Sequence, residues 1–322
     1  MTRQVRRRTK SPTINRRTFL TVTAGLALTS ATGRAAGVEV EVLGTAQDAG
    51  LPHLGCSEDR CLRAFADPSL RKRVASIGIR AGGIRAGDSL FLVDATPDIV
   101  SQITDLQLGR DRGRRPLDGI LLTHAHIGHY LGLAFLGKES IAADRVPVYC
   151  TESMADYLSQ NGPWSLLVSS EQVVLRPMGG KVRLADNLEV EALEVPHREE
   201  FTDTIGFIFT GPKKSLLYIP DIDRWEELEP SIEKLAERVD ILLLDGSFWD
   251  PGRELSARDP SKIPHPPMPE TMRRLGPFAD TRRIYFTHLN HTNPAWDKDS
   301  PERAKIEEAG FGIVEEGDRF EL

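Results

Sequence analysis

The chain has 322 residues, of which 40% are hydrophobic and 27% charged, a composition typical of a globular protein whose core needs no disulfide framework. Residues 1–37 contain eight Lys and Arg residues and no acid, whereas the remaining chain carries 33 basic and 47 acidic residues. An acidic body argues against nonspecific nucleic-acid binding, which needs positive charge facing the phosphates, and leaves a small-molecule substrate as the expected partner.

The basic N-terminal segment has the features of an export signal. Arg16 and Arg17 precede an apolar stretch at residues 19–28, and small residues follow. The apolar stretch is too short to span a bilayer, so no stable membrane insertion is expected. The arginine pair resembles the signal of the twin-arginine (Tat) export machinery. We therefore predict a twin-arginine signal at residues 1–36 and a single periplasmic or secreted domain at residues 37–322. The alternative is a disordered basic tail.

The remaining chain predicts an alternation of strands and helices. Alternating residues and bounded apolar runs predict strands at residues 38–46, 74–83, 88–96, 117–126, 146–150, 187–197, 240–248 and 281–291, with hairpins at 204–223 and 312–322. Apolar spacings of three and four predict helices at residues 97–108, 152–161, 231–239 and 300–310. Residues 47–61 and 250–267 are rich in Gly, Pro and polar residues and predict loops. Hairpins interspersed with helices indicate two sheets covered by helices rather than one doubly wound sheet.

Three of the eight histidines fall within six residues of the stretch "LLTHAHIGHYLGL", directly after an apolar run. His124 and His126 are two residues apart, so on an extended strand they face the same side, and His129 lies one turn further on. Three other potential ligands also end apolar runs: His197, Asp221 and His288. A single histidine in such a place is more often a hydrogen-bonded structural residue. Six potential ligands at strand ends favour a site for zinc, iron or manganese.

The order H-x-H-x-x-H, His, Asp, His resembles the metallo-β-lactamase fold superfamily. The segments "LGTAQDAGLPHLGC", "LVDATPDI", "LLDGSFW" and "THLNHTNPAWDKDSPER" resemble pyrroloquinoline quinone biosynthesis protein B and its relatives. The resemblance implies an α/β fold, a four-layer αββα sandwich with a metal site along one edge. It implies that His124, His126 and His197 bind a first metal. It also implies that His129 and His288 bind a second, bridged by Asp221, with one or two Zn²⁺ ions or with iron or manganese.

The glycine before the third histidine departs from the superfamily motif H-x-H-x-D-H. The motif aspartate normally binds the second metal, so Gly128 leaves that position short of a ligand. One hypothesis is an exported metal-dependent hydrolase that attacks a small ester, lactone or phosphodiester with a metal-activated water. In that hypothesis Asp221 is the base, and His291 is the general acid or a substrate contact. The alternative is a non-hydrolytic mononuclear iron or zinc protein of the quinone-biosynthesis type, either an oxygenase or a quinone carrier. A third possibility is a degenerate fold that is kept for protein contacts.

Three cysteines cannot form a complete disulfide framework. Superfamily relatives carry a cysteine-rich loop that holds a structural zinc, which makes Cys56 and Cys61 a possible structural metal site, completed by His53 or His291. The alternatives are a disulfide and two free thiols. Cys150 ends an apolar strand and is expected to be buried and inert.

Three further residues are candidates for supporting roles. Asp94 and Asp245 end strands and can orient ligating histidines by hydrogen bonds without binding the metal themselves, as such ligands usually require. His265 lies among prolines in the 250–267 loop, which predicts either a lid over the site or a passive surface loop.

Overall fold

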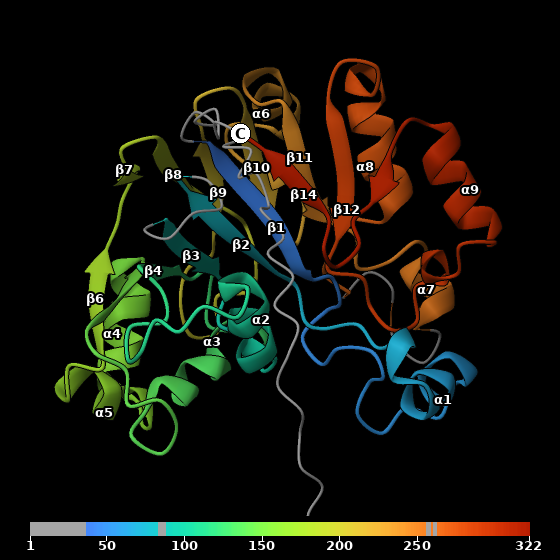
Figure 1. The fold of residues 1–322 in the computed structure, drawn as a ribbon. Coiled ribbons are helices and arrows are strands. Elements are labelled where there is room, and N and C mark those ends of the chain that lie inside the picture. Colours follow the sequence, from blue (N-terminus) through green and yellow to red (C-terminus); the bar gives the residue numbers. More distant parts are fainter. Residues whose placement is uncertain (1–36, 83–87, 256–258, 260–262) are drawn as a thin grey trace, which may run out of the picture. The chain divides into compact units, whose positions relative to one another are not determined.

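The computed structural model describes residues 37–82, 88–255, 259 and 263–322, and in these residues two seven-stranded sheets lie face to face (Figure 1). In spatial order the first sheet contains β14 (Arg319–Glu321), β1 (Val38–Gly44), β2 (Ser76–Ala81), β3 (Ser89–Val93), β4 (Gly119–Leu121), β5 (Val146–Cys150) and β6 (Val173–Pro177). The second contains β13 (Gly312–Ile313), β12 (Arg283–Thr287), β11 (Ile241–Asp245), β10 (Ser215–Ile219), β9 (Ile205–Thr210), β8 (Leu188–Glu194) and β7 (Lys181–Ala185).

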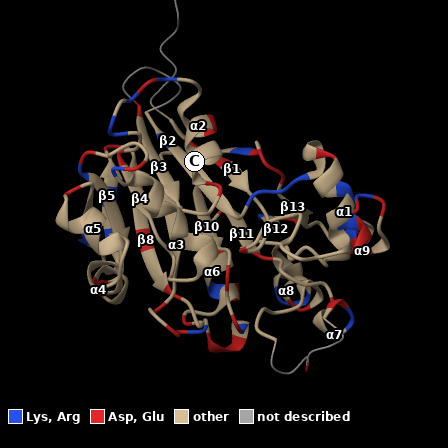
Figure 2. Cartoon of the chain, turned by 90° about the horizontal axis from the view of Figure 1, so that it is seen from below, with Lys and Arg blue, Asp and Glu red and all other residues tan. Residues whose placement is uncertain are grey.

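Helices cover the outer face of each sheet. Beside the first sheet lie α2 (Ile99–Gln107), α4 (Glu152–Gln160) and α5 (Trp164–Ser169), and beside the second lie α6 (Ile232–Arg238), α8 (Met268–Leu275) and α9 (Pro301–Glu308). Shorter helices at the loop end are α1 (Asp59–Ala66), α3 (Ile127–Tyr130) and α7 (Pro251–Glu254). Figure 2 shows that charged residues gather in helices and loops, whereas most strand residues are uncharged.

Side-chain alternation explains the four layers. In β10, Leu216 and Tyr218 pack between the two sheets, and Leu217 and Ile219 pack under the helices of the second sheet. Successive strand residues point to opposite faces, so a strand covered on both sides must be apolar throughout. Each fully buried side chain of this kind contributes about 1.5–3 kcal/mol. The αββα sandwich expected from the sequence is confirmed.

The two predicted hairpins have different outcomes. The hairpin at residues 204–223 is confirmed, because β9 and β10 pair antiparallel. The hairpin at residues 312–322 is wrong. β13 pairs with β12 in the second sheet, and β14 pairs with β1 in the first. The two short strands each cover a different sheet edge, which would otherwise present unpaired backbone groups.

Several elements were not expected from the sequence. These are α1, α3, α5, α7, α8, β6 and β7. Helix α1 begins inside the predicted loop at residues 47–61, and α7 lies inside the predicted loop at residues 250–267. The signal predicted at residues 1–36 lies outside the described residues. Within the described residues, no helix has the length and apolar character needed to cross a membrane.

Candidate metal centre

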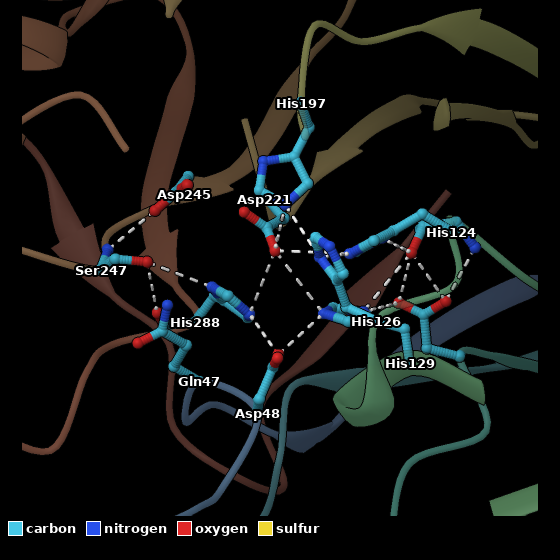
Figure 3. A network of polar contacts seen from close by, with 12 residues as sticks. Gln47, Asp48, His124, His126, His129, His197, Asp221, Asp245, Ser247 and His288 are labelled. Carbon is cyan, nitrogen blue, oxygen red and sulfur yellow. Dashed lines mark hydrogen bonds and ion pairs between the residues drawn. The ribbon is translucent and has the colours of Figure 1, made fainter. Parts of the chain in front are cut away.

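The predicted ligands converge because the strands before them run in the same direction. β10, β11 and β12 are parallel neighbours, and β8 is parallel to β10 because each is antiparallel to β9. The carboxyl ends of β8, β10 and β12 therefore meet at one edge, which brings together His197, Asp221 and His288. The loop after β4 delivers the remaining three histidines to the same place (Figure 3).

A first ligand group consists of His124, His126, His197 and Asp221. Nδ1 of His126 lies 2.8 Å from Nε2 of His124 and 3.0 Å from Nε2 of His197. Oδ2 of Asp221 lies 3.2 Å from Nε2 of His197 and 3.5 Å from Nε2 of His124. Ligand atoms around a tetrahedral zinc ion are spaced roughly 3.3 Å apart, so these atoms are close to the spacing that a cation requires.

A second ligand group consists of Asp48, His129, Asp221 and His288. Oδ2 of Asp221 lies 3.8 Å from Nε2 of His129 and 3.9 Å from Nε2 of His288, so the same oxygen faces both groups. Asp48 was not among the residues expected from the sequence. The available signal was that Asp48, like the other ligands, lies just beyond the end of a strand, here β1.

The outer nitrogen of every imidazole in the two groups has an oxygen partner. His124 faces Thr123 Oγ1 at 2.9 Å, His126 faces Glu200 at 3.0 Å, His129 faces Asp94 at 2.7 Å, His197 faces Asp223 at 2.7 Å, and His288 faces Ser247 Oγ at 3.2 Å. An imidazole that donates from its outer nitrogen presents a lone pair from the inner one. Five inner nitrogens therefore point into one small volume, as metal coordination requires.

The predicted supporting aspartates contact different histidines. Asp94 lies against His129, as expected for an orienting residue, and it also accepts hydrogen bonds from Thr123. Asp245 contacts His265, with 2.7 Å between Oδ2 and Nδ1, rather than one of the predicted ligands. Asp223, which supports His197, was missed although it lies only two residues after Asp221 in the same loop after β10.

Charges in the centre favour ionised acids. Burial opposes ionisation of Asp221, but His197, His265 and His288 around it hold its pKa well below the ordinary value. Burial also opposes a charge on His197, yet Asp221 and Asp223 raise the pKa of His197 to about 9. Burial, together with neighbouring histidines, holds the pKa of His124 well below its ordinary value. A bound cation takes the place of protons in such a site.

His265 packs inward beside the centre. Its side chain is buried, and its Nδ1 lies 3.2 Å from Oδ1 of Asp221. The backbone at His265 has a φ of +80°, an uncommon conformation for a residue with a side chain. The described end of the loop is therefore part of the site rather than a passive surface. A pocket of about 710 Å³ opens here, and its lining includes Gln47, Arg198, Asn290 and His291.

His291 belongs to a separate group of potential ligands outside the centre. With Cys56 and Cys61 it forms the cysteine cluster, and its Nδ1 lies 3.5 Å from Sγ of Cys61. The ring of His53 stacks on His291 at 4.2 Å, and the two cysteines form no disulfide with each other. Burial, with His53 and Arg60 nearby, lowers the pKa of His291 to about 4. A neutral imidazole suits a metal ligand better than a general acid at neutral pH.

Comparisons with known proteins identify the family and the fold. A model of the beta-lactamase superfamily domain matches residues 90–289. Coenzyme PQQ synthesis protein B from Methylobacillus flagellatus is 28% identical over 311 residues, which cover 87% of this chain and 98% of that protein. The crystal structure of zinc-bound PqqB from Methylobacterium extorquens has a TM-score of 0.72 and 26% identity, covering 88% of this chain and all of that one. A diphosphatase of the PhnP family shares the fold, with a TM-score of 0.62 and 22% identity, covering 90% of this chain and 98% of that one.

Proposed function

We propose that this chain, which belongs to the beta-lactamase superfamily, is a metalloprotein of quinone cofactor metabolism. In this proposal it binds a quinone-type small molecule beside its metal centre. The observation that carries the proposal is the set of five inward-facing imidazole nitrogens around Asp221. The relatives that match nearly the whole chain are coenzyme PQQ synthesis proteins, which supports the quinone assignment.

The donor set fits zinc. Three imidazoles and a carboxylate are ligands that zinc accepts, and a zinc-bound relative supports the same ion here, with iron or manganese as alternatives. We assign His124, His126, His197 and Asp221 to the first ion. Such an ion polarises a substrate oxygen and lowers the pKa of a coordinated water. The orphaned Oδ1 of Asp221 faces His265, so this pair can hold or accept a proton at the side of the pocket.

The pocket beside the centre suits a small polar molecule. Arg198 offers a guanidinium group to a carboxylate, and Gln47 and Asn290 offer amide groups to carbonyl oxygens. The pocket volume of about 710 Å³ lies in the range of small-molecule sites. These groups match the carboxylate and carbonyl oxygens of a quinone cofactor or its precursor.

Binding of pyrroloquinoline quinone by the purified, metal-loaded chain tests the proposal. Calorimetric titration should give saturable binding that is lost in Asp221→Ala, whereas Asp186→Asn, which changes an exposed acid in the turn between β7 and β8, should bind normally. Metal content and oxygen consumption should be measured on the same samples. A fully metal-loaded chain that binds neither the quinone nor its precursors would refute the proposal.

Hydrolysis is the second candidate. The observation in its favour is that one oxygen of Asp221 faces two neighbouring ligand groups, an arrangement suited to a pair of metal ions that activate water and substrate together. Turnover of a model phosphodiester or lactone that disappears in His126→Ala would support it. Metal-loaded protein without turnover of either substrate class would reject it.

We also propose that the chain is exported through the twin-arginine route. Support comes from Arg16 and Arg17 ahead of the short apolar stretch. Replacing both arginines by lysine should leave the protein in the cytoplasm when cell fractions are compared. Unchanged distribution would refute this route.

A further inference from the structure

Gly128 is surrounded so closely that no side chain fits there. A Cβ atom at this position would lie 2.5 Å from Oδ1 and 2.7 Å from Cα of Asp48. Non-bonded contacts of this length do not occur, so an aspartate at position 128 and the observed loop around Asp48 exclude each other. The space that a side chain at position 128 would enter is taken by the carboxylate of Asp48.

The Asp48 carboxylate points at His129 and His288, the two histidines of the second ligand group. Its Oδ1 lies 3.3 Å from Nε2 of His129 and 3.6 Å from Nε2 of His288 (Figure 3). All three atoms are buried, and none has a hydrogen-bond partner among the residues that the structure describes. Buried polar atoms are nearly always satisfied, so a group of orphaned atoms that face one another indicates a missing partner. A divalent cation satisfies one oxygen and two imidazole nitrogens at once.

The main chain holds Asp48 in this position. The amide of Gln47 donates to the carbonyl of Leu289, immediately after His288, at 3.0 Å. The amide of Gly50 donates to the carbonyl of Gln47 at 2.7 Å, and Gly50 has a φ of +73°, which closes a tight turn around Asp48. The carboxylate is therefore presented by a turn that is attached to the strand end carrying His288.

We propose that Asp48 is a ligand of the second metal position and supplies the carboxylate that Gly128 cannot, so that the centre binds two divalent cations. This inference rests on the proposed metal centre. The second ion would be held by Asp48, His129 and His288, with Asp221 shared between the two positions. The glycine is then a requirement of the site, because it makes room for a carboxylate that arrives from a different loop.

Manganese binding to the full chain tests this role. Mn²⁺ favours oxygen and imidazole ligands over thiolates, so the cysteine cluster should not add to the number of Mn²⁺ ions bound per chain. The metal-free wild type should bind two Mn²⁺ ions, with the electron paramagnetic resonance signal of a coupled pair. Asp48→Asn keeps the shape but weakens the ligand, and should bind one ion with an isolated-ion spectrum. Affinity for the second ion should fall by about 100-fold or more, exceeding the effect of losing an orienting group.

Two further variants separate ligand loss from a folding defect. Asp186→Asn makes the same chemical change at an exposed turn and should retain two ions. Gly128→Ala should displace Asp48 and also lose the second ion, while the first ion binds with unchanged affinity and thereby reports a folded site.

The number of Mn²⁺ ions that each variant binds separates a failure of this inference from a failure of the proposed metal centre. Two ions of unchanged affinity in Asp48→Asn would overturn the role of Asp48 and leave the centre standing. A single ion in both wild type and Asp48→Asn would overturn it as well. A wild-type chain that binds no ion would overturn the proposed centre together with this inference.

Discussion

The buried centre and the cysteine cluster are two candidate metal sites with different construction. In the centre, residues up to 240 positions apart converge from strand ends, and each imidazole is held by an oxygen partner behind it. The cysteine cluster takes Cys56 from the loop before α1, Cys61 from α1 itself, and His291 from the segment after β12. It offers three ligand atoms within reach of one another, whereas the centre offers three overlapping groups of four that share Asp221, the third being Asp221, Asp245, His265 and His288.

The difference separates a site built for chemistry from one suited to holding a loop. The centre opens into a pocket, and its ligands depend on the sandwich for their positions. The cysteine cluster joins the loop before α1 and the start of α1 to the segment after β12, so a metal there would fix a loop that contributes to the same pocket.

The largest expected effect is the loss of both central ions in Asp221→Ala. Oδ2 of Asp221 faces both ligand groups, so its removal takes a ligand from each, and affinity for both ions should fall by more than about 100-fold. Metal content measured after dialysis should fall to the amount held by the cysteine cluster. Retention of both ions would mean that the two groups do not share this carboxylate.

The next effect concerns the cysteine cluster alone. Cys61→Ser should abolish the thiolate absorption band of bound Co²⁺ and remove the part of the zinc-dependent stability that the cysteine cluster contributes. That part is roughly 4 kcal/mol when free zinc is 1,000 times its dissociation constant. The two central ions should remain.

Cys150→Ala is the matched control for this variant. Cys150 is buried in the first-sheet core, where burial raises its pKa to about 12, so its loss should change stability equally with and without zinc. If zinc changes the thermal stability of Cys61→Ser and Cys150→Ala by the same amount, the cysteine cluster holds no metal.

The parts of the centre that the sequence predicted share one physical signature. His197, Asp221 and His288 each follow a strand that the sequence pattern marks, by alternation in β8 and by apolar runs in β10 and β12, so their common edge follows from sheet geometry. Asp48 and His265 lie in Gly- and Pro-rich loops, where position depends on tertiary contacts such as the amide of Gln47 on Leu289. The same limit explains the wrong C-terminal hairpin, because the turn gives no sign that its two strands join different sheets.

A medium effect is expected from the residues behind the ligands. Asp94→Asn should lower the affinity for the second ion by about 10–100-fold, because Asp94 contacts His129 directly. The affinity for the first ion should fall less, because Asp94 reaches His124 only through Thr123. Asp223→Asn should lower the affinity for the first ion and leave the second unchanged, because Asp223 contacts His197. Mn²⁺ titration of the two variants measures this directly. If each variant lowered the affinity for both ions equally, Asp94 and Asp223 would act on the fold as a whole and not on single ligands.

The smallest effect is expected from Ser247→Ala. Oγ of Ser247 is a neutral partner 3.2 Å from Nδ1 of His288, and it donates to the backbone carbonyl of His288 at 3.1 Å. A neutral hydrogen bond contributes about 1 kcal/mol, so affinity for the second ion should fall by about fivefold, against the larger loss in Asp94→Asn. The first ion should not respond, because His288 is not part of the first ligand group. A loss in Ser247→Ala as large as that in Asp94→Asn would mean that the position of the imidazole controls affinity, whereas the expected gap means that the charge of the supporting carboxylate does.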